Sequence, residues 1–138
     1  MCGSLFFLID ISYICENQYN VMVKSDIFWA ICEKAAETFK VSVDGIMRDM
    51  RDKDCTDARC VVVQYARRVG YSAKDIAGYV LEYCDEQYDK DILNRKARTV
   101  NNIYCSYMTR CNHDKLFCLL SVDVKKWLKE TYGVGEDY

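Results

Sequence analysis

The residues with the clearest capacity for chemistry lie in the stretch RKARTVNN, at positions 95–102. Arginine and asparagine can form paired hydrogen bonds with the edges of guanine and adenine in the major groove of DNA. The candidate base-reading side chains are Arg95, Arg98, Asn101 and Asn102. Lys96 and Thr99 lie between them and are candidates for holding phosphates. The stretch therefore predicts a surface that could contact double-stranded DNA.

The spacing around this stretch predicts a helix over about residues 92–110. Arg95, Arg98 and Asn102 are three and four residues apart, which places them on one face of a helix. The residues predicted to form the opposite, apolar face are Ile92, Leu93, Val100, Ile103, Tyr104, Tyr107 and Met108. Four basic residues and no acidic residue occur between Ile92 and Arg110. An alternative is that this polar face is merely solvated, as charged helix faces usually are.

Capping residues and apolar spacing predict the elements that must position this helix. The predicted helices cover about residues 26–40, 43–50, 56–69, a segment that begins at residue 72, 92–110 and 121–133. Thr56, Ser72 and Ser121 are the predicted N-caps of three of them, and Asp75 completes a capping box with Ser72. Gly70 is the predicted C-cap of the 56–69 helix. The sequence thus predicts two helices joined by a tight glycine turn.

The composition favours an all-α fold of five to six helices in a single domain. The chain has 138 residues, no proline and only six glycines, which argues against a β-sandwich or a barrel. Apolar residues make up 51% of the chain, enough for a packed core. We expect a helix-turn-helix core over residues 26–110, with packed terminal segments at 1–25 and 111–138.

Charge and cysteine content limit the classes of partner and compartment. The net charge of -2 and the pI near 5.4 give no overall attraction for nucleic acid or an anionic membrane, so DNA binding requires a local basic patch. The nine cysteines are odd in number and irregularly spaced, which indicates a reducing compartment such as the cytoplasm. The apolar N-terminus is short, is interrupted by Asp10 and lacks a basic flank, so it predicts neither a signal peptide nor a membrane span.

Metal binding and catalysis are the weaker alternatives. Cys105, Cys111, His113 and Cys118 are residue types that bind zinc, but their spacing matches no standard site. The chain has a single histidine and no serine or cysteine motif beside it, so no nucleophile–base pair is indicated. We therefore expect no metal, no cofactor, no small-molecule substrate and no enzymatic activity.

The stretch from Glu37 to Val80 resembles the DNA-binding C-terminal domain of the bacterial replication initiator DnaA. In that family a helix ends in a phrase like YKVSVADLL, a basic loop follows, an AR.R segment opens the next helix, and a phrase like S..EIG..F forms the first helix of a helix-turn-helix. Here FKVSVDGIM fits the first phrase and SAKDIAGYV the last. Arg51 falls on the loop arginine and Arg59 on the second arginine of the AR.R segment, although residues 44–59 hold five acids and four bases. The family's GGRDHTTV motif has no counterpart after Val80, and no nucleotide-binding P-loop is present. The chain is therefore not an initiator, but about a third of it is similar to the initiator's DNA-binding module.

The resemblance implies a Trp-repressor-like helix-turn-helix in which the helix after the turn enters the major groove. It also implies that Arg51 and Arg59 approach the phosphate backbone, and Lys53 lies in the same loop. The alternative for this loop is pairing of its arginines with neighbouring aspartates such as Asp52 or Asp57.

Two functions remain open from the sequence. One is binding of double-stranded DNA in transcription or as a replication accessory factor, with a possible homodimer reading two half-sites. The other is a protein-interaction module that keeps the fold without binding DNA, which the acidic pI and the acid-rich segment at 82–91 favour. DNA binding requires the arginines to gather on one side, away from Asp85, Glu86 and Asp89. The alternative predicts that acids and bases intermingle.

Overall fold

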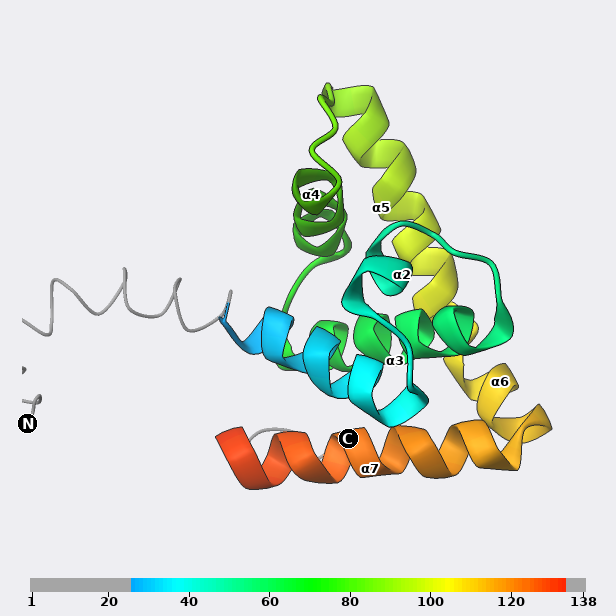
Figure 1. Ribbon diagram of the computed structural model, residues 1–138. Helices are drawn as coiled ribbons and strands as arrows, with labels where there is room; N and C mark the ends of the chain where they lie inside the picture. Colours follow the sequence, from blue (N-terminus) through cyan, green and yellow to red (C-terminus); the bar gives the residue numbers. More distant parts are fainter. Residues whose placement is uncertain (1–25, 134–138) are drawn as a thin grey trace, which may run out of the picture. The chain divides into compact units, whose positions relative to one another are not determined.

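Figure 1 shows the computed structural model of the protein, which describes residues 26–133. Every regular element in this range is a helix, which confirms the all-α prediction. The chain divides into two units, residues 1–30 and 31–138. Of the first unit, residues 26–30 are described, and they are helical. The predicted single domain stays a prediction, and the predictions for residues 1–25 lie outside the described range.

A helical segment over residues 26–39 and the short helix α2 (Val43–Met47) come first. Ser42 caps α2 as predicted, because its hydroxyl accepts a hydrogen bond from the Gly45 backbone N–H at 2.9 Å. The helix ends at Met47, three residues before the predicted end. Two residues later the backbone of Asp49 is in the left-handed region, with φ of 60°, and the chain turns away from the helix.

The central helix α3 (Lys53–Val69) begins earlier than predicted. Its N-cap is Asp52, whose carboxylate accepts a hydrogen bond from the Cys55 backbone N–H at 3.2 Å. The predicted cap, Thr56, lies inside the first turn and donates its hydroxyl to the Asp52 carbonyl. A carboxylate at the helix start also interacts favourably with the helix dipole, so the earlier start is the more stable one.

The glycine turn after α3 matches the prediction. Gly70 has φ of 127°, a conformation that L-residues rarely adopt, and its N–H reaches the carbonyls of Ala66 and Arg67. The next helix, α4 (Ala73–Tyr83), opens with the predicted capping box between Ser72 and Asp75. The two helices are therefore joined as the sequence indicated.

The predicted helix over 92–110 is two helices. α5 (Lys90–Cys105) is capped by Asp89, and α6 (Tyr107–His113) follows after a break at Ser106. The Ser106 hydroxyl donates to the Ile103 carbonyl at 2.7 Å, and its N–H bonds to the same carbonyl and to that of Asn102. The serine side chain thus closes the last turn of α5, a local competition with the helix that serine often makes.

The last helix, α7 (Lys115–Tyr132), begins six residues before the predicted start. Asp114 caps it by accepting a hydrogen bond from the Phe117 backbone N–H at 3.0 Å. The predicted cap, Ser121, is wholly buried in the middle of the helix. Gly133 ends α7 in the left-handed conformation, as predicted.

Helix α3 lies between α4 and α5 on one side and α7 on the other in Figure 1. Apolar side chains from these helices fill the space around α3 and lose most of their contact with water, which is the main stabilising contribution. The largest fully buried ones in residues 31–133 are Tyr71, Phe117, Ile31, Ile46, Ile76, Leu128, Val61, Val62 and Val124. Met108, which was predicted to lie on the apolar face of the 92–110 helix, is instead exposed.

In the range 26–133, none of the helices has both the length and the apolar character needed to cross a membrane.

Candidate nucleic-acid interface

Helix α5 presents a polar stripe to solvent. Asp91, Arg95, Arg98, Asn102 and Cys105 are all exposed and are spaced by four and three residues, so they lie on one line along the helix; we call this line the α5 stripe. Ala97 and Val100, on the opposite side of α5, are buried. Because that side is packed into the core, the stripe has one fixed orientation.

The two arginines of the stripe are available for contact. In the described part of the chain, neither the Arg95 nor the Arg98 guanidinium has an ion-pair or hydrogen-bond partner. Asn102 is exposed on the same line, and Asn101 is exposed beside it. Asp91 is the one acid of the stripe and lies one turn before Arg95. The structure thus brings four of the predicted base-reading residues onto one exposed side of α5.

The two predicted phosphate contacts on α5 are engaged within the protein. The Lys96 ammonium lies 2.9 Å from a carboxylate oxygen of Asp49 and is largely buried. The Thr99 hydroxyl donates to the Arg95 carbonyl at 3.3 Å. A phosphate would therefore have to displace Asp49 before it could bind Lys96.

Arg59 holds backbone carbonyls together inside the protein. Its guanidinium donates three hydrogen bonds to backbone carbonyls, at 2.8 Å to Ile46, 3.0 Å to Gly45 and 3.0 Å to Met50. Asp49 lies 3.6 Å away, and the arginine side chain is only 15% exposed. The planar guanidinium thereby satisfies carbonyls at the end of α2 and joins this end to α3. A side chain held in this way is poorly placed to reach a phosphate.

Lys53 belongs to a second cluster of opposite charges. Asp57 is almost completely buried and accepts hydrogen bonds from Lys53 at 2.7 Å and from Arg110 at 3.0 Å. Lys53 also donates to Asp114 at 2.7 Å, 61 residues later in the chain. We call Lys53, Asp57, Arg110 and Asp114 the Asp57 cluster. It links the starts of α3 and α7 with α6.

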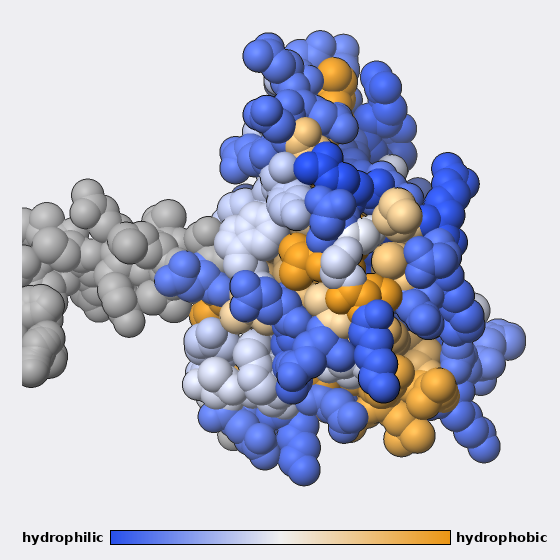
Figure 2. All heavy atoms as spheres, viewed as in Figure 1, coloured by the Kyte–Doolittle hydropathy of each residue, from blue (hydrophilic) through white to orange (hydrophobic). Residues whose placement is uncertain are grey.

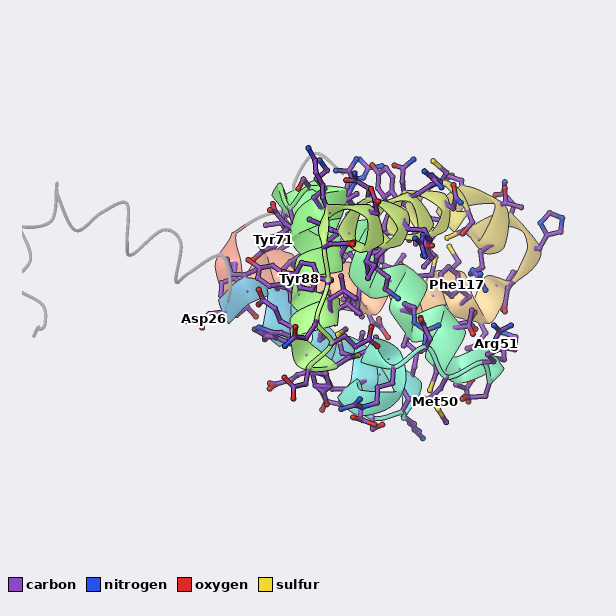
Figure 3. All side chains as sticks on the ribbon, turned by 90° about the horizontal axis from the view of Figure 1, so that it is seen from above. Asp26, Met50, Arg51, Tyr71, Tyr88 and Phe117 are labelled. Atoms are coloured by element: carbon purple, nitrogen blue, oxygen red, sulfur yellow. The ribbon has the colours of Figure 1, made fainter. Side chains whose placement is uncertain are left out.

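Residues 53–59 of the predicted basic loop are the first turns of α3. Among the cations of residues 51–59, Arg51 alone is exposed without a partner in the range 26–133. Figure 3 places Arg51 and Met50 on the outer side of the loop that joins α2 to α3. Charges of both signs therefore intermingle around this loop, whereas the α5 stripe keeps its two arginines unpaired.

The turn between α4 and α5 is acidic. Residues 84–89 form this turn, and Asp85, Glu86 and Asp89 are all exposed in it. In a helix-turn-helix the first turn of the second helix usually approaches the bases. Here that end of α5 carries negative charge, which repels the phosphates of a duplex. Contact with the middle of α5 is therefore electrostatically more favourable than contact with its first turn.

The structure contains a surface groove and a buried hydroxyl network that the sequence did not predict. A shallow groove of about 430 Å³ lies between α2, α4 and α5, with Met47, Leu81 and Ile92 among the apolar residues that line it and Arg95 and Glu86 among the charged ones. Tertiary packing alone brings these segments together, so no local pattern could have indicated the groove.

The second feature is a buried hydroxyl network. The Tyr65 hydroxyl lies 2.9 Å from the Ser121 hydroxyl and 3.2 Å from that of Tyr107, and Tyr107 and Ser121 are also hydrogen-bonded. Burial raises the pKa of both tyrosines, so their hydroxyls stay protonated at neutral pH. The network joins α3, α6 and α7 and satisfies its own polar atoms, which indicates a structural role.

The predicted alternative of a zinc site is not supported by the arrangement of the side chains. Cys105 is exposed, Cys111 and Cys118 are partly buried, and the His113 ring is hydrogen-bonded through Nδ1 to the Thr109 carbonyl at 2.8 Å. Within residues 26–133, no three His, Cys, Asp or Glu side chains are grouped so as to hold a metal ion.

Two carboxylates that cap helices, Asp114 at α7 and Asp52 at α3, make the stability of the fold sensitive to acid. The Lys53 ammonium and the Phe117 N–H lower the pKa of Asp114, and hydrogen bonds from Cys55 lower that of Asp52. A carboxylate with a lowered folded-state pKa contributes stability above the unfolded-state pKa of about 3.9, and this stability is lost as the pH falls through the folded-state value. We expect the melting temperature to fall steadily below about pH 4.

Thermal unfolding by circular dichroism over this pH range checks the prediction. The matched control is Asp114→Asn, which keeps a capping oxygen but cannot titrate, and whose melting temperature should depend less on pH. An identical pH dependence in wild type and variant would contradict the assignment of this effect to Asp114.

No family model, curated protein or solved structure matches the chain. The likeness to the DnaA domain therefore stays a prediction from the sequence.

Proposed function

We propose that the protein binds double-stranded DNA through the α5 stripe. The observation that carries the proposal is the exposure of Arg95, Arg98 and Asn102 on one line of a helix whose other side is buried. Arginine and asparagine are the side chains best suited to guanine and adenine edges, and an α-helix fits the major groove. The arginines have no competing partner among residues 26–133, so binding does not require an internal ion pair to break.

The geometry limits where the contact is made. The acidic turn at residues 84–89 disfavours an approach by the first turn of α5, so Arg95 to Asn102 would form the centre of the interface. Lys53, Arg59 and Lys96 are engaged within the protein, which leaves few cations for phosphates. We therefore expect modest affinity and a shallow salt dependence, because the electrostatic contribution scales with the number of phosphates neutralised.

A protein-interaction module is the second candidate. The Asp57 cluster and the Asp49 pairs favour it, because they mix acids and bases in the region that the DnaA resemblance assigns to phosphate contact. On this proposal the α5 stripe would bind an acidic protein surface in place of DNA. Either function is one of binding, not catalysis, and fits an accessory role in transcription or replication.

The seven cysteines in the described range are all free thiols. This supports our proposal that the protein works in the cytoplasm or another reducing compartment.

Fluorescence anisotropy of a labelled mixed-sequence duplex tests DNA binding. We expect the wild type to bind, and its affinity to fall as the salt concentration rises from about 50 to about 200 mM. In the Arg95→Ala/Arg98→Ala variant, the slope of the logarithm of the binding constant against the logarithm of the salt concentration should become shallower by up to about two units. The matched control is Lys126→Ala/Lys129→Ala, which removes the same charge from exposed positions of α7 and should bind like the wild type.

The variant Asp91→Asn tests whether DNA contacts the α5 stripe itself or is attracted to the protein without a defined contact. Removing this acid from the stripe should tighten DNA binding, because it takes a repulsive charge away from the interface. If the wild type shows no binding at the lowest salt, the DNA proposal fails and the protein-interaction proposal takes its place.

A further inference from the structure

The first half of α7 carries an exposed apolar face. Leu116, Leu119 and Val122 are 64%, 65% and 48% exposed. Their spacing of three residues keeps them on one side of the helix, opposite the buried Phe117, Ser121 and Val124 side. Figure 2 shows hydrophobic side chains gathered on the surface over this part of α7. Single exposed leucines are common, but three in a row on one helix face indicate a surface that another apolar surface covers.

Charges flank this apolar face in an arrangement that is complementary to itself. Lys115 lies four residues before Leu119 and Asp123 lies four residues after it. Both are exposed, and neither has an ion-pair partner among residues 26–133. If two α7 helices pack antiparallel about a two-fold axis at Leu119, Lys115 of one copy lies level with Asp123 of the other. The two-fold symmetry creates this pair twice.

The same axis matches the apolar residues. Leu119 of one copy meets Leu119 of the second, and Leu116 lies level with Val122. Leu119 lies on the axis, and Leu116 and Val122 each lie three residues from it. The apolar residues of one copy therefore face the apolar residues of the other, and the charged residues face each other at both edges. Such self-complementarity is what an interface between identical subunits requires.

We propose that the protein forms an antiparallel homodimer through Leu116, Leu119 and Val122 of α7, with Lys115 and Asp123 paired between copies. Three apolar side chains per copy bury less surface than the roughly 1,200–2,000 Å² of stable complexes. The dimer is therefore weak, with a dissociation constant in the micromolar range. The inference does not depend on DNA binding, because α7 carries none of the α5 stripe.

Sedimentation velocity of the full chain, from about 5 to about 500 µM, tests the dimer. We expect a concentration-dependent shift from monomer to dimer in the wild type and monomer alone in Leu119→Glu, which places two like charges together on the axis. Met50→Gln is the matched control, because Met50 is also an exposed apolar residue but lies outside α7. It should dimerise like the wild type.

A charge reversal tests the pairing itself. Lys115→Asp replaces two attractive pairs with two repulsive ones and should weaken the dimer about tenfold. Asp123→Lys should do the same, and the double variant should recover most of the wild-type affinity. Circular dichroism confirms that each variant is folded.

Two results would overturn the proposal. One is a monomer at every concentration. If hydrogen exchange then showed that the α7 face is protected in the wild type but not in Leu119→Glu, another segment of the same chain would cover this face and no dimer would form. The other is a dimer that neither Leu119→Glu nor the charge reversals weaken.

Discussion

Replacing Arg59 with alanine is expected to lower the free energy of unfolding by about 3 kcal/mol. Three backbone carbonyls, those of Gly45, Ile46 and Met50, lose their charged donor at once. Hydrogen bonds from charged groups are each worth more than neutral ones, and the part-buried Ile46 carbonyl loses this donor, whereas the Gly45 carbonyl still accepts from the Met50 N–H. For a protein of this size the melting temperature should fall by about 10 °C.

Urea unfolding followed by circular dichroism measures the effect. Arg51→Ala is the matched control, because Arg51 precedes the same helix but is exposed, and its loss should change stability by less than about 0.5 kcal/mol. Arg59→Lys should be intermediate, since a single ammonium cannot reproduce the planar array of donors. If Arg59→Ala were as stable as the wild type and lost DNA binding, the structural role of Arg59 would be wrong.

Replacing Asp57 with alanine should cost about 2 to 3 kcal/mol. Asp57 is the buried acceptor between Lys53 and Arg110, and its removal leaves the Arg110 guanidinium without its carboxylate. The Arg110 Nε is already buried without a hydrogen-bond partner among residues 26–133, and the guanidinium carbon lies 5.8 Å from the centre of the Phe117 ring. The cost lies at the lower end for buried pairs, because Arg110 is 31% exposed and Lys53 is 68% exposed.

A double-mutant cycle isolates the pair. Arg110→Met keeps the apolar stem of the side chain and removes the charge, so Asp57→Ala/Arg110→Met should be more stable than Asp57→Ala alone. The measurement is again the free energy of unfolding in urea for the wild type, both single variants and the double variant. Strictly additive single effects would show that the two residues do not interact.

These two predictions bear on function as well as on stability. If Arg59 and Asp57 act as described, the charged segment at 51–59, which includes the start of α3, serves to join α2, α6 and α7 to α3, and only Arg51 among its cations stays free to reach a phosphate. DNA binding then depends mainly on the α5 stripe. The anisotropy experiment with Arg95→Ala/Arg98→Ala is therefore the decisive functional test.

Local sequence signals predicted several helix ends correctly and misplaced others. Ser42, the Ser72–Asp75 capping box and Gly70 act within four residues of their own positions, so the sequence around them is sufficient. Thr56 and Ser121 have the same chemical character but lie inside helices, because Asp52 and Asp114 stand earlier in the chain and accept the first free N–H groups. In both helices the earlier of the two capping residues begins the helix.

The sequence also predicted one part of the candidate interface correctly and missed another. Periodicity alone placed Arg95, Arg98 and Asn102 on one face of a helix, and the structure has them exposed on one side of α5. The partners of Lys96 and Arg59 were beyond reach of any local pattern. The Lys96–Asp49 pair joins residues 47 positions apart, and the Arg59 hydrogen bonds reach back up to 14 positions to the carbonyls of α2.

The sequence by itself therefore determined the helical class, the glycine turn and the composition of the exposed face of α5, because these follow from contacts within one or two helical turns. Only the tertiary structure decided which cations are neutralised and that α7 turns Leu116, Leu119 and Val122 outward. These outcomes depend on which segments pack against α3, and burial of apolar surface sets that packing across the whole chain.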